Sequence, residues 1–285
     1  MESLIRELND ILSSRNYEFS VKLVKVAKNN FELDGIAVGK GESHVWPVLY
    51  PDGYFMSIDN DERIRVLEEF YNEYGVEKLL NRLEYFCKDY IFQNVVPRLV
   101  SDSNADRIKR HEIVADSFLD MLVEYYVPIH SLCNDTTDAG YILRNYHLED
   151  LDIDRNDLHR YAIRNLKPRI RIHEVNQLLS QLAEGYDIFD TPLQMYVVTV
   201  EKFCYGASAI LDYHTLIDLG DILGNPFIIF PSSVHEVIAV SVGLAADLNA
   251  CKAMVYEINR EQLELMDRLT DSVYICEDGN LSVYS

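Results

Sequence analysis

Short apolar runs that come in neighbouring pairs, with turn residues between the two runs, constrain the fold of this chain more than any other feature of its sequence. The first pair covers residues 19–26 and 31–38, and a Lys-Asn-Asn turn separates them. Later pairs cover residues 119–127 with 139–144 and 195–200 with 207–211, and a last pair lies within 273–284. Strands joined by short turns pair side by side, so the pattern predicts sheets built from hairpins.

Segments with helical spacing lie between these pairs. Apolar residues recur every three or four positions over residues 2–14. Further helices are expected over 61–74, from 76 into the nineties, and over 155–166, 213–223 and 245–259. Asp59 or Asn60 before the second helix and Asp154 before the fourth are typical capping residues. The sequence therefore predicts the α+β class, with mixed or antiparallel sheets built from hairpins and intervening helices.

The length of 285 residues fits either two small domains or one large domain. With 12 glycines and 8 prolines, the chain is too poor in both for long disordered or fibrous stretches. We expect an N-terminal α+β region over 1–100 and a C-terminal α+β region over 101–285, with one continuous domain as the alternative.

The balance of charge restricts the possible partners. The chain has 47 acidic and 26 basic residues, a formal net charge of −21. A surface of this sign repels phosphate backbones and anionic membranes, so we expect no direct phosphate contact with nucleic acid and no membrane association. A protein partner stays possible, and nothing in the sequence fixes the oligomeric state.

Cysteine use and the N-terminus both indicate the cytoplasm. The five cysteines are widely spaced and form no CxxC pair, so the sequence indicates neither a zinc site nor a disulfide framework. The first residues are acidic and amphipathic, unlike a signal peptide, and no apolar run reaches the ~20 residues of a membrane span. We therefore expect a cytoplasmic protein without a cofactor.

One segment places reactive side chains between two apolar runs. It contains Ser232, Ser233 and His235. As a catalytic site, His235 is the general base or a metal ligand, and Ser233 or Ser232 is the nucleophile. The alternative is a turn in which the hydroxyls cap backbone groups and His235 bonds to a carbonyl group. The absence of a GxSxG motif favours the turn.

Two other motifs fail on spacing. Three His-Glu pairs, which begin at His111, His173 and His235, all lack the second histidine of HExxH. The alternating acids from Asp150 suggest a calcium loop, but its sixth position is Arg155 where such a loop needs glycine. We therefore predict no metal site.

An aromatic turn is the second candidate site. Tyr50, Asp52 and Tyr54 surround a Pro-Asp-Gly turn, and Trp46 lies just before it. Tyrosine and tryptophan favour interfaces because their rings are apolar and carry one polar group. The turn is predicted to form a binding rim, with core packing at a hairpin as the alternative.

Several segments together resemble an uncharacterised family of Gram-positive gut bacteria, domain-of-unknown-function family 5688. The most specific segments are 205–207, with the sequence Tyr-Gly-Ala, and 230–237, with the sequence Phe-Pro-Ser-Ser-Val-His-Glu-Val. Others are 26–30, 47–54, 96–100, 118–120, 195–199 and 271–274. Ser101 and Met121 stand where Asn and Leu are expected in the family. The resemblance covers nearly the whole chain and implies no activity, because the family has none assigned.

Three hypotheses for function follow. The first is a non-enzymatic binding or regulatory protein of the bacterial cytoplasm that acts through protein contacts. The second is a hydrolase-type enzyme centred on His235 with Ser232 or Ser233. The third is an acidic mimic of nucleic acid, which needs a continuous band of acidic side chains. Whether His235 and Ser233 line a concave pocket discriminates between the first two.

Overall fold

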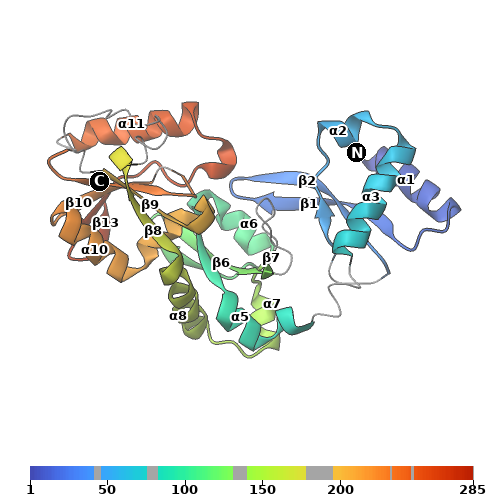
Figure 1. Cartoon of the computed structure of the whole chain (residues 1–285), viewed down its shortest axis with the longest axis horizontal. Helices are drawn as coiled ribbons and strands as arrows, with labels where there is room; N and C mark the ends of the chain where they lie inside the picture. The colour runs from blue at the N-terminus through green and yellow to red at the C-terminus, as the bar shows by residue number, and fades with distance from the viewer. Residues whose placement is uncertain are drawn as a thin grey trace. The chain divides into compact units, whose positions relative to one another are not determined.

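The computed structural model describes residues 1–41, 46–75, 83–130, 140–177, 195–231, 233–244 and 247–284. Its contacts divide the chain into two compact units, Met1–Phe86 and Cys87–Ser285. Helices and antiparallel sheets build both units (Figure 1), so the chain has the expected α+β fold.

The N-terminal unit is a three-stranded antiparallel sheet with helices on one face. Its helices are α1 (Glu2–Ser14), α2 (Gly53–Ser57) and α3 (Asn60–Tyr74), followed by a 3-10 turn over Leu83–Phe86. Its strands are β1 (Ser20–Lys28), β2 (Phe31–Gly39) and β3 (Val48–Leu49), in the order β1-β2-β3. Val21 pairs with Val38, and both pack against Leu8, Leu12 and Leu67 in the core of this unit.

The C-terminal unit begins with a sheet in the order β4-β6-β5, to which β7 adds by pairing with β6. The strands are β4 (Val96–Ser101), β5 (Ala115–Phe118), β6 (Met121–Pro128) and β7 (Gly140–Ile142). The helices of this part are α5 (Lys88–Asn94), α6 (Ala105–Arg110), α7 (Asn145–Asp150) and α8 (Arg155–Leu166). Asp154 caps α8 through its carboxylate, as expected.

A six-stranded antiparallel sheet forms the rest of this unit, in the order β13-β12-β10-β11-β9-β8. Its strands are β8 (Ile170–Glu174), β9 (Met195–Val200), β10 (Phe227–Pro231), β11 (Val237–Ser241), β12 (Tyr274–Glu277) and β13 (Asn280–Val283). Its helices are α10 (Tyr213–Leu223) and α11 (Leu248–Glu261).

A 3-10 segment, η6 (Gly206–Leu211), joins the two sheets of the C-terminal unit. The Leu99 amide of β4 donates to the buried Ser208 hydroxyl of η6 over 2.9 Å. Tyr125 of one sheet and Tyr274 of the other belong to one apolar core together with Ala207. The two sheets therefore share one apolar core.

Two expected elements differ from the structure. Residues 207–211 were expected to form a strand, but they belong to the 3-10 segment η6. Most of this run is buried between the two sheets, where none of the described strands pairs with it. The helix expected from 76 into the nineties is replaced, within the described part, by the 3-10 turn at Leu83–Phe86 and by α5, which ends at Asn94 before β4.

The division between the two compact units falls after Phe86, so α5 and β4 belong to the second unit. The reason lies in packing: α5 contacts α8, and β4 pairs along its whole length with β6.

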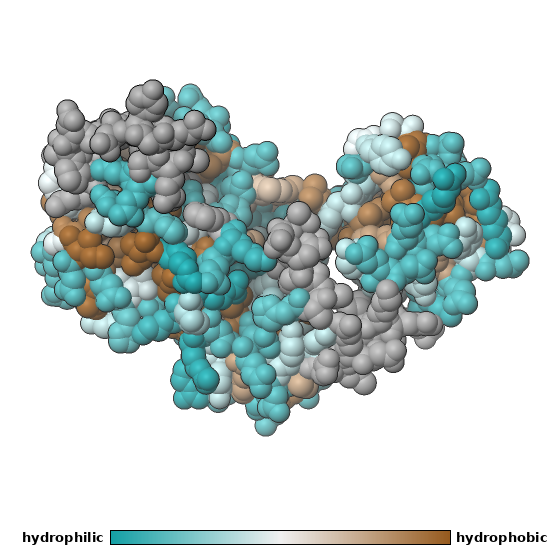
Figure 2. Space-filling model, viewed as in Figure 1, coloured by the Kyte–Doolittle hydropathy of each residue, from teal (hydrophilic) through white to brown (hydrophobic). Residues whose placement is uncertain are grey.

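Hydrophilic residues cover most of the surface seen in Figure 2, in keeping with the high content of charged residues. Within the described ranges, no helix combines the length and the apolar character needed to cross a membrane.

Candidate functional site

His235 lies in the turn between β10 and β11, and both nitrogens of its ring have partners. Nδ1 accepts a hydrogen bond from the Tyr205 backbone amide over 3.3 Å. Because Nδ1 is the acceptor, the ring proton sits on Nε2, which donates to Asp267 Oδ1 over 3.1 Å. The Asp267 carbonyl oxygen also accepts from the Val234 amide, so the aspartate is tied to the same turn. Partners at both ring nitrogens thus fix the orientation of the His235 side chain.

Ser233 is buried and bonds within its own turn. Its hydroxyl oxygen accepts the backbone N–H of His235 over 3.0 Å, and its own amide donates to the Glu236 carbonyl oxygen. The Ser233 hydroxyl therefore caps the His235 backbone amide within the turn. A serine nucleophile needs a histidine nitrogen that accepts its proton, and in this arrangement both nitrogens are already engaged. Ser232 lies outside the described residues.

The two segments that carry the most specific family resemblance meet at this turn. The Ala207 amide donates to the Val234 carbonyl oxygen, and the Thr199 hydroxyl donates to the His235 carbonyl oxygen over 2.8 Å. Gly206 fits against that same carbonyl and the Thr199 hydroxyl so closely that a Cβ atom would collide with both. Tyr205 has a left-handed backbone with φ 55°, which aims its amide at the His235 ring. The segments 205–207 and 230–237 therefore pack closely against each other, and this contact is called the junction below.

A stack of rings and a guanidinium group continues from His235 toward the four-stranded sheet. The Tyr205 ring meets the His235 ring edge-on at 5.8 Å between centroids. The guanidinium carbon of Arg98 lies 4.2 Å from the Tyr205 ring centroid and 3.3 Å from that of Tyr126. Arg98 and Tyr126 come from adjacent strands, β4 and β6, whose register places them on one face. Tyr205 therefore contacts both His235 and Arg98.

A buried ion pair lies next to this stack. Glu124 is the direct cross-strand partner of Arg98, and its carboxylate pairs with Arg107 of α6. Arg107 Nε also donates to Asn104 Oδ1 over 3.0 Å. Burial lowers the pKa of Arg107, with the charge of Tyr205 opposing it. Sequence patterns did not point to Arg98, Arg107, Glu124, Tyr126 or Asp267, because only the fold brings these distant positions together.

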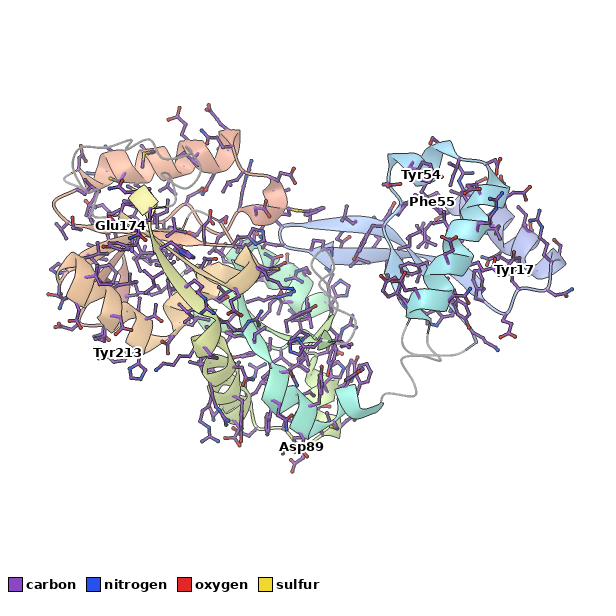
Figure 3. All side chains as sticks on the ribbon, viewed as in Figure 1. Tyr17, Tyr54, Phe55, Asp89, Glu174 and Tyr213 are labelled. Atoms are coloured by element: carbon purple, nitrogen blue, oxygen red, sulfur yellow. The ribbon has the colours of Figure 1, made fainter. Side chains whose placement is uncertain are left out.

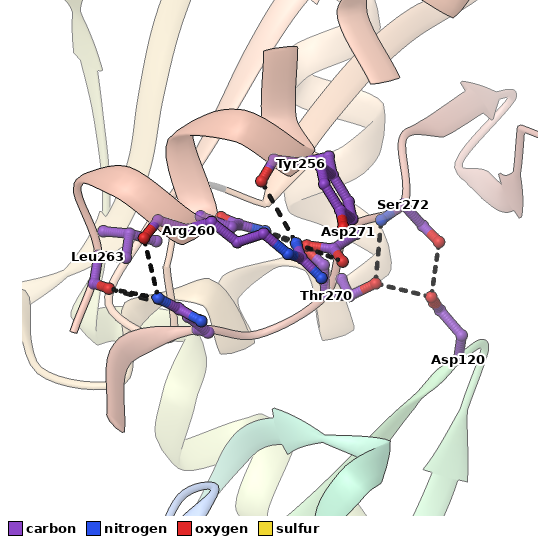
Figure 4. Close-up of polar contacts among 9 residues, drawn as sticks. Asp120, Tyr256, Arg260, Leu263, Thr270, Asp271 and Ser272 are labelled. Carbon is purple, nitrogen blue, oxygen red and sulfur yellow. Dashed lines mark hydrogen bonds and ion pairs between the residues drawn. The ribbon is translucent and has the colours of Figure 1, made fainter. Parts of the chain in front are cut away.

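A second polar cluster centres on Asp120, in the turn between β5 and β6 (Figure 4). Its carboxylate accepts from the hydroxyls of Thr270 and Ser272, each over 2.7 Å, and from the hydroxyl of Tyr274. Burial acts to raise the pKa of Asp120, but the hydrogen bonds from these three hydroxyls outweigh it and lower the pKa. The neighbouring Asp271 pairs with Arg260 over 3.1 Å. Asp120 thus connects the β5–β6 hairpin to the start of β12 and the segment before it.

In the aromatic turn of the N-terminal unit, the rings of Tyr50 and Tyr54 are exposed, and the Asp52 carboxylate makes a hydrogen bond to the backbone. Tyr50, Tyr54 and Met56 are 42%, 60% and 46% exposed, whereas Phe55 is buried in the core. Figure 3 shows Tyr54 and Phe55 side by side in α2. The Asp52 carboxylate caps α2 by accepting the Phe55 amide over 2.8 Å. Asp52 therefore shapes the turn, and Tyr50, Tyr54 and Met56 form its exposed surface, called the rim below.

A pocket of about 430 Å³ lies between α6 and β5. Its lining includes Lys109, Glu112 and Ser117 but neither His235 nor Ser233. Within the described ranges, no three His, Cys, Asp or Glu side chains gather as metal ligands.

Comparison with known proteins gives a family and no activity. The model of a family of unknown function, DUF5688, matches residues 1–277. No curated protein matches the chain, and no solved structure matches it. Since the match spans nearly the whole sequence, the chain belongs to the DUF5688 family.

Proposed function

We propose that this chain is a non-enzymatic binding or regulatory protein of the bacterial cytoplasm that acts through protein contacts. The observation that carries the proposal is the rim of the N-terminal unit, where three large apolar side chains lie exposed within seven residues of sequence. Tyrosine and methionine are enriched at the centres of protein interfaces. The buried Phe55 and the Asp52 cap hold this exposed surface on a rigid turn, which reduces the entropy lost on binding.

The surroundings of His235 support the same proposal. A general base needs a nitrogen with an open lone pair, and here the lone pair of Nδ1 receives the Tyr205 amide. The ring also sits between a backbone amide and a carboxylate that both belong to the junction of the two sheets. These contacts fit a histidine that stabilises the fold.

Site-specific photo-crosslinking tests the proposal. A photoreactive phenylalanine analogue replaces Tyr54 in the full chain, which is expressed in a bacterium that carries the protein. Tyr213 at the start of α10 is the matched control, because it is 55% exposed and lies in the other unit (Figure 3). We expect one discrete crosslinked protein from position 54 and none from position 213. No adduct at position 54, or the same adducts at both positions, contradicts the proposal.

The second candidate is the hydrolase-type enzyme centred on His235. The observation in its favour is the His235–Asp267 pair, because a carboxylate that orients a histidine is part of the serine hydrolase arrangement. Its test is a panel of ester and amide substrates with the unmodified protein and with His235→Ala. Turnover that disappears in the variant while the fold stays intact establishes the enzyme. An absence of turnover in both leaves the binding proposal standing.

A further inference from the structure

The side chain of Asn9 in α1 shows which backbone groups of β1 face away from the sheet. Its amide nitrogen donates to the Val21 carbonyl oxygen over 2.8 Å, and its amide oxygen accepts from the Val21 N–H over 3.0 Å. This pair of bonds is the one that a neighbouring strand would make with Val21. Val38, which pairs with Val21 across the hairpin, supports this orientation. Its amide points away from β1 and donates to the Pro47 carbonyl oxygen.

The remainder of the β1 edge follows by alternation. In an antiparallel pair, every second residue directs its N–H and C=O groups outward, so Leu23, Lys25 and Ala27 share the orientation of Val21. Among the described residues, β2 is the one strand that pairs with β1. Figure 1 shows that the hairpin of β1 and β2 extends beyond the helices of its own unit. Beyond Val21, which bonds to Asn9, an added strand could therefore pair with the outward backbone groups of Leu23, Lys25 and Ala27.

The charge of β1 is opposite to that of the whole chain. The strand carries Lys22, Lys25 and Lys28 and no acidic residue, in a chain of net charge −21. On one face, the ammonium groups of Lys22 and Lys28 lie 3.8 and 4.7 Å from the ring centroids of Trp46 and Tyr50.

On the other face, Lys25 is 72% exposed and its ammonium group lies 4.0 Å from the Asp34 carboxylate. An ion pair so exposed and so long contributes little, so Lys25 can exchange this partner for another carboxylate at little cost. Both faces of the edge strand thus present positive charge.

We propose that the β1 edge binds an extended acidic segment of a partner protein as an added strand. The inference rests on the proposed function, because it names the kind of partner that the N-terminal unit binds. Backbone groups of Leu23, Lys25 and Ala27 bond to the segment, and its glutamate or aspartate side chains meet the three lysines. A second copy of β1 does not suit this edge, because it would bring lysines against lysines.

Amide signals in nuclear magnetic resonance spectra of the isotope-labelled full chain test this inference. The probe is a peptide of about ten residues with alternating glutamate and valine, long enough for an average strand. We expect the amide protons of Leu23, Lys25 and Ala27 to shift and to exchange more slowly with solvent. The amides of Val24 and Val26, which face β2, should change much less. A peptide of the same length with lysine in place of glutamate should cause none of these changes.

Two substitutions at one position separate charge from backbone pairing. Lys25→Gln keeps the outward N–H and removes the charge, so the acidic peptide should bind about two- to fivefold more weakly. Lys25→Pro also removes the N–H, which β2 does not use, so the hairpin stays formed and binding should fall about tenfold or more. Unchanged signals of α1 and β2 in both variants verify the fold.

The edge inference is wrong if about 1 mM acidic peptide leaves the three outward amides unchanged, or if the lysine peptide shifts them equally. In that case the lysines of β1 serve to block strand addition. The crosslinking result at Tyr54 then tests the proposed binding function separately. A discrete adduct at the rim without edge binding supports the binding function and contradicts strand addition at β1. If both experiments fail, both proposals are wrong.

Discussion

The Tyr274 hydroxyl donates a hydrogen bond to the Asp120 carboxylate, although the two residues lie 154 positions apart in the sequence. Tyr274 is fully buried, and its pKa is raised by burial and by the neighbouring carboxylate. Its hydroxyl therefore stays protonated and acts as a permanent donor. The Thr270 and Ser272 hydroxyls complete a set of three donors to one carboxylate, so Asp120 carries the contact between its hairpin and the six-stranded sheet.

Asp120→Asn tests the contribution of this contact. The amide keeps the size of the side chain but replaces one oxygen with an N–H donor, which then faces hydroxyl donors. We expect the free energy of unfolding to fall by about 1–3 kcal/mol, the cost of losing hydrogen bonds to a charged group. Urea denaturation measures the change. Asp218→Asn, at an exposed position of α10, is the control and should stay within about 0.5 kcal/mol of the unmodified protein. Equal effects of the two substitutions would contradict this role for Asp120.

Acid should remove the same stabilisation. The folded-state pKa of Asp120 is lowered, so the folded state binds the proton less tightly than the unfolded state does. The contribution is fully present above the unfolded pKa of about 4 and is lost as pH falls toward the folded pKa. The difference in unfolding free energy between the unmodified protein and Asp120→Asn should therefore be constant near neutral pH and shrink below about pH 4. A difference that grows on acidification would show that the sign is wrong.

Substitution of His235 should reveal a stabilising residue. His235→Ala leaves the Tyr205 amide without its acceptor and Asp267 without its donor, so we expect a loss of about 1–3 kcal/mol of unfolding free energy. Asp267→Asn keeps an oxygen that accepts from Nε2 and should cost less than His235→Ala. Thermal and urea denaturation of both variants provide the comparison. A His235→Ala variant as stable as the unmodified protein would favour the catalytic interpretation.

The parts of the fold that depend on neighbouring residues were predictable from the sequence. The carboxylates of Asp59 and Asp154 cap α3 and α8 as expected, because a cap needs only the first turn that follows it. The hairpin of β1 and β2 also followed from its turn, in which Asn30 adopts φ 64°.

The parts that depend on register or on distant segments were not predictable. Residues 207–211 are apolar like a strand, yet they form η6, because its buried position between two sheets outweighs the local preference. Asp267 approaches His235 from 32 positions away, and Arg98 meets Tyr126 only because of the register of β4 and β6. No periodicity in the sequence encodes these contacts.

Gly206 provides the sharpest test of the packed junction. A Cβ atom at this position would collide with the His235 carbonyl oxygen and the Thr199 hydroxyl, and the carbonyl belongs to backbone that cannot rotate away. We therefore expect Gly206→Ala to lower the unfolding free energy by about 3 kcal/mol or more, since both strands at the junction must shift.

Gly220→Ala is the matched control for this substitution. Gly220 lies within α10, and a Cβ atom there would meet its nearest neighbour, Phe227, at an ordinary 3.7 Å. Alanine favours the helix over glycine, so this variant should gain about 0.5–1 kcal/mol. Urea denaturation of the two variants should thus move the midpoint in opposite directions. If both glycines tolerate alanine, the junction has room that the structure does not show, and the close approach of η6 to the His235 turn is wrong.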